Sequence, residues 1–239
     1  MPICPDCYSH KIKKNGSTHY GKQNHKCKVC QRQFVLNNTH TIGLERRQRI
    51  EKALKERISL RGICRIFEVS LSWLQYFAHN LWEQTPDNLG LPNEQLKQIK
   101  ELQVFGIQAD ELWSFVKKKK YKRWIWVAYD PIHRLVIAHH IGGRGKRAAK
   151  KFWNKIPRIL RKCNFETDDW EAYRSIIPAT QHKVGKDLTF YIEGFNATIR
   201  ARVSRLVRKS LSFSKLDKWH NLAIAWFFWQ FNLERQPYI

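Results

Sequence analysis

The sequence predicts an α/β domain preceded by two smaller modules, and three changes of pattern along the chain indicate this. Residues 1–36 are polar and rich in cysteine, residues 44–84 carry apolar side chains at helical spacing, and the second half opens on apolar, strand-like runs. Strands that alternate with helices are typical of α/β proteins. With 239 residues, 43% of them hydrophobic, the chain has room for one good-sized domain and one or two small ones.

Two pairs of cysteines lie in the first module, Cys4 with Cys7 and Cys27 with Cys30. Each pair has the spacing C-x2-C, which lets backbone N–H groups bond the thiolates, and two such pairs close a tetrahedral site around zinc. A segment this short and polar buries too little surface to fold unaided. We therefore predict a structural zinc site with these four ligands. Four unrelated buried cysteines are the less favoured alternative, because the segment has few other residues that could form a core.

Residues 44–84 are predicted to form a helix followed by a helix-turn-helix. The last two helices lie within residues 59–82, with Ser70 as the N-cap of the second. In a helix-turn-helix this second helix enters the major groove, so we expect Ser72 and Gln75 to face base edges. An ordinary helical hairpin is the alternative interpretation.

Residues 85–103 begin with proline, glycine and polar residues and are predicted to be a linker. The main domain is then expected over residues 104–239. Apolar runs predict strands at residues 104–110, 121–130, 134–141 and 162–168, with a weaker signal at 182–184. Helices are predicted at residues 146–156, from Gly194 to about Lys209, and from Leu216 to Asn232.

The charge of the chain indicates a nucleic-acid partner. Lys and Arg number 44 against 20 acids, which gives a formal net charge of +24 and a pI near 10.0. Such a balance favours double-stranded DNA over a membrane surface, and the N-terminus lacks the apolar stretch of a signal peptide. We expect a cytoplasmic, nucleoid-associated protein. Phosphate contacts are expected from two basic sets, with a solvated surface as the alternative: Lys117, Lys118, Lys119 and Lys120, and Arg200, Arg202, Arg205, Arg208 and Lys209.

Three carboxylates stand where predicted elements begin or end: Asp110 and Asp168 at strand ends, and Glu193 at a helix start. Acids that face a polyanion are repelled unless a divalent cation lies between them and the phosphates. Two-metal phosphoryl transfer needs acids from different elements that converge on ions about 3.5–4 Å apart. We therefore expect the three to bind Mg²⁺. Taken singly, Asp110 could be a turn residue, Asp168 half of an exposed acidic pair, and Glu193 a capping acid.

The sequence around these acids resembles that of a known family. The segments ADELWSFV, WIWVAYD, TDDWEAY, YIEGFNATIRARVSRLVRKS and LSFSK are similar, in order and spacing, to the catalytic half of insertion-sequence-one-type transposases. The cysteine quartet and the helix-turn-helix match the other half. The resemblance implies a ribonuclease-H-like fold, an Asp-Asp-Glu triad, magnesium dependence and recognition of terminal inverted repeats. By this resemblance Asp110 matches the acid of D-E-x-W, Asp168 that of T-D-x-W, and Glu193 that of I-E-x-x-N.

Three positions in two segments depart from the family pattern. Asp169 stands where members often have glycine, so a second carboxylate competes for the role of Asp168. Gly194 and Phe195 replace a basic and a polar residue, and glycine inside a helix weakens the segment that carries Glu193.

A transposase that joins two DNA ends is expected to be a homo-oligomer, with zinc and magnesium as its cofactors. Two other functions remain open from the sequence. One is a non-catalytic DNA-binding regulator that uses the first 84 residues. The other is a related structure-specific nuclease that cuts without joining.

Overall fold

A computed structural model describes residues 2–36, 38, 42–206 and 212–235 of the chain. The chain divides into two compact units, Met1–Ala53 and Leu54–Ile239. Among the described residues no helix combines the length and the apolar character that a bilayer crossing requires.

The first unit contains a small antiparallel sheet of β1 (Ile12–Ser17), β2 (Gln23–Cys27) and β3 (Gln33–Val35), in that order. Its apolar cluster consists of Cys4, Cys27 and Phe34, with Ile12 packed against it. So small a cluster contributes little burial energy, in agreement with the expectation that this segment needs another source of stability. The helix α1 (Leu44–Leu54) begins after this sheet.

The helices α2 (Leu60–Phe67) and α3 (Leu71–Glu83) open the second unit. The predicted cap is confirmed, because Ser70 Oγ accepts a hydrogen bond from the Trp73 N–H at 3.2 Å. Glu68 ends α2 in the left-handed conformation, with φ of 48°, which turns the chain between the two helices. Ile63 and Leu74 are buried in this pair of helices, whereas Ile66 is 61% exposed.

A five-stranded mixed sheet forms the centre of the second unit, in the order β6-β5-β4-β7-β8. The first three strands are an antiparallel meander, and the last two run parallel to β4 and to each other. The strands are β4 (Ile107–Phe115), β5 (Lys122–Asp130), β6 (Leu135–Gly142), β7 (Phe165–Thr167) and β8 (His182–Val184). All five overlap the predicted strands, and the weak signal at 182–184 is confirmed.

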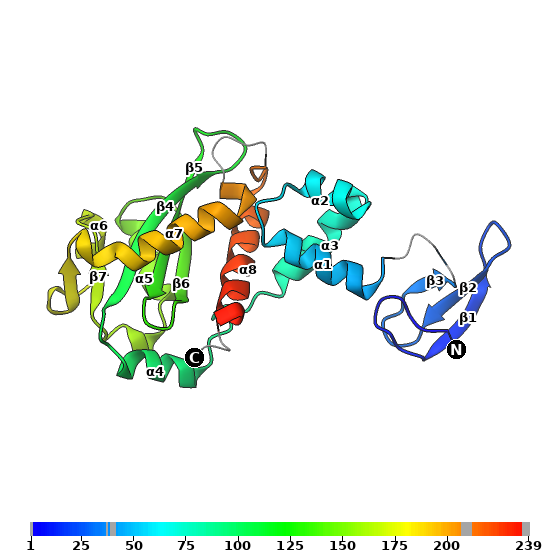
Figure 1. Cartoon of the computed structure of the whole chain (residues 1–239), viewed down its shortest axis with the longest axis horizontal. Coiled ribbons are helices and arrows are strands. Elements are labelled where there is room, and N and C mark those ends of the chain that lie inside the picture. The colour runs from blue at the N-terminus through cyan, green and yellow to red at the C-terminus, as the bar shows by residue number, and fades with distance from the viewer. Residues whose placement is uncertain (1, 37, 39–41, 207–211, 236–239) are drawn as a thin grey trace. The chain divides into compact units, whose positions relative to one another are not determined.

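Helices cover both faces of this sheet (Figure 1). On one face, α5 (Lys146–Lys155) and α6 (Glu171–Arg174) pack through Phe152 and Tyr173 against Trp126 of β5. On the other face lie α7 (Phe190–Arg202) and α8 (Asp217–Arg235), and their Phe195 and Phe228 belong to one cluster with strand residues. The chain between these elements forms short 3-10 turns at Arg158–Leu160, Ala179–Gln181, Asp187–Thr189 and Ser204–Leu206.

Two predicted elements are corrected by the structure. Residues 85–103 are not simply a linker, because they hold α4 (Asn93–Glu101), whose Leu96 and Ile99 are buried in the same cluster as Ile107. The apolar spacing of this segment is helical, and its proline and glycine precede the helix rather than interrupt it. The helix expected from Gly194 begins earlier, at Phe190, and ends at Arg202.

Candidate active site and cysteine cluster

Asp110 and Asp168 lie on adjacent parallel strands of the central sheet. Ala109 of β4 pairs with Thr167 of β7, so the two aspartates follow a matched pair and start from the same face of the sheet. Asp168 directly follows the last residue of β7, as predicted. Asp110 does not end its strand, because β4 continues to Phe115, and the apolar residues that follow Asp110 extend the pairing with β5.

The helix α7 brings Glu193 to the same face of β4. Asn196, three residues after Glu193 and therefore on the same side of the helix, donates from Nδ2 to Asp110 Oδ2 at 2.6 Å. Thr189 Oγ1 donates to Glu193 Oε1 at 3.2 Å, which holds that carboxylate near the start of the helix. The hydrogen bond between Asn196 and Asp110 fixes the helix against the strand.

Asp110 lies close enough to the other two acids for their charges to act on it. Burial raises the pKa of Asp110, and the negative charges of Asp168 and Glu193 raise it further. The Glu111 N–H, which donates to Asp110 Oδ1 at 2.7 Å, and the charge of Arg200 act in the opposite direction. A site where acids from three elements repel one another is a site where a cation is stabilised.

A buried glutamine that the sequence reasoning missed ties this helix to the strand. Gln108 is 2% exposed, and its Oε1 accepts from the Ile192 N–H at 2.9 Å. Its Nε2 donates to the Leu188 carbonyl and to Glu166 Oε2. Gln108 is a single amide in an apolar run, and no spacing rule marks it in the sequence. Asn196 is the asparagine of the I-E-x-x-N segment, but no role was assigned to it from the sequence. Together Gln108 and Asn196 place the first turn of α7 over Asp110.

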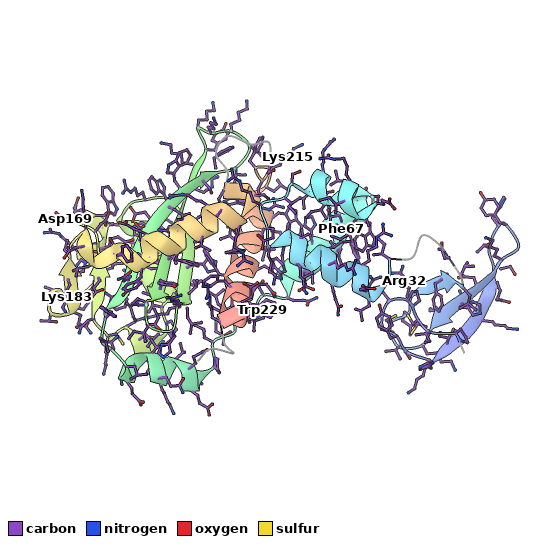
Figure 2. The ribbon with its side chains drawn as sticks, in the orientation of Figure 1. Arg32, Phe67, Asp169, Lys183, Lys215 and Trp229 are labelled. Atoms are coloured by element: carbon purple, nitrogen blue, oxygen red, sulfur yellow. The ribbon has the colours of Figure 1, made fainter. Side chains whose placement is uncertain are left out.

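Asp169, the competing carboxylate, points into a different environment. Its side chain is 71% exposed and pairs with Arg174 of α6. Figure 2 shows Asp169 and Lys183 at the same end of this unit, beside β7 and β8. Asp168 instead accepts the Trp170 N–H at 3.2 Å and raises the pKa of Asp110. The geometry therefore favours Asp168 over Asp169 as the partner of Asp110.

The predicted basic contacts divide into exposed and internal residues. The four lysines of the β4–β5 connection, Lys117 to Lys120, are exposed, as is Arg200. Arg202 does not fit the prediction, because it pairs with Glu234 at 3.0 Å and also with Glu56.

Arg205 does not fit it either. Its guanidinium lies 4.7 Å from the Trp82 ring centroid and donates to Ser214 Oγ at 2.7 Å. Burial lowers the pKa of Arg205 to about 10. Arg208 and Lys209 lie outside the described residues. On α3, Ser72 and Gln75 are both exposed, so they remain candidates for DNA contact.

The four cysteines of the first unit form a compact cluster. The Sγ atoms of all four lie within 4.8 Å of one another, with Cys4 and Cys30, and Cys7 and Cys27, each 3.5 Å apart. A tetrahedral zinc with Zn–S bonds of about 2.3 Å needs sulfurs roughly 3.8 Å apart. The backbone N–H groups of Cys30 and Val29 contribute to lowering the pKa of the Cys27 thiol to about 6, which favours the thiolate that binds metal. The donor set fits zinc.

No carboxylate group in the described residues is gathered as tightly as these cysteines. Asp110, Asp168 and Glu193 are farther apart than the cysteine sulfurs, but the charges of Asp168 and Glu193 still raise the pKa of Asp110.

The fold and the candidate site together define a class of protein. Asp110 lies on β4, Asp168 follows β7, and Glu193 lies on α7. A five-stranded mixed sheet of this kind, covered by helices on both faces, fits a ribonuclease-H-like catalytic domain. A family model described as IS1 transposase matches residues 104–233, which is more than half of the 239 residues. The chain belongs to the IS1 transposase family, and this membership implies a polynucleotidyl transferase.

Curated relatives agree with the family. The chain is 35% identical over 118 residues to the insertion element IS1 protein InsB of Shigella flexneri, a match that covers 49% of this chain and 89% of the relative. It is 33% identical over 123 residues to the iso-IS1n protein InsB of Shigella dysenteriae, covering 50% and 91%. A third relative, the IS1 4 protein InsB of Escherichia coli K12, is 33% identical over 118 residues, covering 49% and 70%.

Proposed function

We propose that the chain binds the terminal inverted repeats of a mobile element and catalyses metal-dependent cleavage and transfer of DNA strands. The observation that carries this proposal is the placement of the three acids: Asp110 and Asp168 follow a matched pair of strand residues, and α7, which carries Glu193, is hydrogen-bonded to Asp110 through Asn196. Family membership supports the reaction class. The net charge of +24 supports DNA as the substrate.

Asp110, Asp168 and Glu193 are the residues that would hold Mg²⁺. Bound divalent ions lower the pKa of an attacking water or hydroxyl and stabilise the leaving oxygen. Asn196 orients the Asp110 carboxylate by its 2.6 Å hydrogen bond, so that only part of this carboxylate is left free for a ligand. Gln108 of β4 fixes the start of α7, because its Oε1 accepts the Ile192 N–H. Arg200 brings positive charge to the edge of the same site, where a phosphate would approach.

The N-terminal residues supply recognition in this proposal. Residues 1–36 form a zinc-binding module with Cys4, Cys7, Cys27 and Cys30 as ligands, supported by the cluster of their sulfurs. Residues 44–84 form a helix-turn-helix that reads the element ends, supported by the exposed Ser72 and Gln75 on a capped helix. Residues 104–239 form the catalytic domain. The enzyme works as a homo-oligomer on element ends and target DNA in the cytoplasm.

Asp110→Asn tests the catalytic assignment. This change removes a metal ligand but keeps the size of the side chain, so we expect end binding to persist and strand joining to fall at least 100-fold, an order of magnitude typical of a lost catalytic group (~3 kcal/mol). Asp169→Asn is the matched control, because Asp169 is exposed and paired with Arg174. Joining by the Asp110 variant at the wild-type rate would contradict the proposal. Cleavage without joining by the wild type would instead indicate a nuclease.

Zinc content tests the recognition module. We expect one zinc per full-length chain by atomic emission, and Cys30→Ser is expected to lower both that content and end binding. Cys163→Ser is the control, since Cys163 is buried beside the central sheet and not in the cluster. Full metal content in the Cys30 variant would exclude the four-cysteine site.

A further inference from the structure

A buried glutamate lies on the opposite face of β4 from Asp110. The side chain of Glu111 is 1% exposed. It accepts hydrogen bonds from Arg144 at 2.7 Å and from the Tyr173 hydroxyl at 2.9 Å. A carboxylate this deep is unfavourable unless it is paired and hydrogen-bonded. Arg144 supplies the opposite charge, and Arg144 and Tyr173 supply the hydrogen bonds, so these two residues stabilise the buried Glu111 carboxylate.

Arg144 is itself held between two tryptophans. Its guanidinium carbon lies 4.4 Å from the ring centroid of Trp124 and 4.0 Å from that of Trp170. The Trp170 indole N–H also donates to the Arg144 carbonyl at 3.2 Å. A planar guanidinium can stack on both rings while it keeps its N–H edge on a carboxylate, which an ammonium cannot do. The side chain is 38% exposed, so its position is set by these contacts and not by deep burial.

These contacts connect the two candidate aspartates. Glu111 and Trp170 each donate a backbone N–H to one of them, to Asp110 Oδ1 at 2.7 Å and to Asp168 Oδ1 at 3.2 Å. Arg144 touches the side chains of both donors. A continuous path of contacts therefore runs from Asp110 through Glu111, Arg144 and Trp170 to Asp168. β4 and β7 pair over only three positions, so their register alone gives Asp168 limited support.

We propose that Arg144 is a positioning residue that fixes the separation of Asp110 and Asp168 and thereby sets the affinity of the active site for divalent ions. This inference rests on the proposed function. In this proposal Arg144 does not bind the metal itself, since its guanidinium is a cation that is hydrogen-bonded to Glu111 and in contact with two indoles. Its effect on the reaction passes through the geometry of the two carboxylates.

Mn²⁺ binding to the full-length chain, followed by electron paramagnetic resonance, tests this role with Arg144→Lys. Lysine keeps the positive charge but lacks the planar guanidinium that contacts the indoles and Glu111 together. We therefore expect Mn²⁺ affinity to fall about tenfold or more, the equivalent of a lost charge-assisted hydrogen bond (~1.5–3 kcal/mol). Strand joining should recover as the metal concentration is raised, and DNA-end affinity should not change. Arg174→Lys is the control, because Arg174 is an exposed arginine on nearby α6.

Each other outcome overturns the inference. Unchanged Mn²⁺ affinity with a lower melting temperature would give Arg144 a purely structural role, and unchanged Mn²⁺ affinity with weaker DNA binding would make it a phosphate contact. Should Arg144→Lys fail to fold, Glu111→Gln carries the same test, since it keeps the shape and removes the charge that holds Arg144. Asp110→Asn separates the two hypotheses: if it leaves Mn²⁺ binding intact, the proposed function fails, and if it alone abolishes binding, only the role of Arg144 fails.

Discussion

Replacing Asn196 with leucine should release the Asp110 carboxylate from the helix that faces it. Asn196 is 3% exposed, and its amide donates to Asp110 Oδ2 at 2.6 Å. Leucine has the same number of side-chain heavy atoms and the same branched shape but a larger volume, so α7 keeps most of its packing while this hydrogen bond is lost. A hydrogen bond to a charged acceptor contributes about 1.5–3 kcal/mol. If that energy holds Asp110 in its metal-binding orientation, its loss raises the Mg²⁺ concentration for half-maximal activity roughly 10- to 100-fold.

The assay is single-turnover cleavage of DNA that carries an element end, measured over a range of Mg²⁺ concentrations. Thr198→Val is the matched control, because Thr198 lies on the same helix and its hydroxyl donates to the Gly194 carbonyl of that helix. We expect the Asn196 variant to approach the wild-type rate only at high Mg²⁺, and the control to follow the wild type throughout. A folded Asn196→Leu protein with the wild-type Mg²⁺ dependence would refute this reasoning.

Two further predictions concern stability and are measured by urea unfolding. Asn232→Leu leaves the Val136 N–H and the Val136 and Leu89 carbonyls without their buried partner. We expect a loss of about 1–3 kcal/mol for each such group, against about 0.5 kcal/mol or less for the exposed Asn80→Leu, and a loss below about 1 kcal/mol in total would contradict this account. Burial lowers the pKa of His220 from 6.5 to about 4, so the unfolded chain binds its proton more readily than the folded chain. The contribution of His220 to stability is therefore full above pH 6.5 and falls by up to about 3 kcal/mol towards pH 4. His220→Met should reduce the slope by this share and leave the share of His139, whose pKa burial also lowers to about 4, whereas an unchanged slope would contradict the assignment to His220.

The sequence indicated the strands well because their signals are local. Apolar runs bounded by turns identified β4 to β7, and a serine after a break identified the cap of α3. The ends of the strands were harder to predict than the strands themselves. Asp110 interrupts an apolar run and so suggested an end, although pairing with β5 continues for five residues beyond it. That pairing depends on a partner strand and not on the run itself.

The strands of the first unit were not predicted, because β1 and β2 are largely polar and follow no alternation of apolar residues. The role of α4 was missed for a related reason. Its few apolar residues form part of the core only because they pack in one cluster with residues of the sheet. In both segments tertiary contacts, rather than local pattern, decide the structure.

The candidate site shows the same division. Charged residues with recognisable surroundings, such as Asp168 and Glu193, could be proposed as candidates from the sequence. The roles of Gln108, Arg144 and Asn196 could not be predicted, although Asn196 is part of the I-E-x-x-N segment, because these roles arise from contacts across 33 or more residues of chain. Arg205 shows the reverse error, since an arginine in a basic run lies against Trp82 instead of facing solvent.

Crystals of the full chain soaked with Mn²⁺ would show most directly whether acids from three separate elements share bound cations. The account predicts an anomalous density peak in contact with carboxylate oxygens of both Asp110 and Asp168, with Glu193 as a further ligand, and no such peak in Asp110→Asn crystals. Manganese bound elsewhere, with this position empty at saturating concentration, would contradict it.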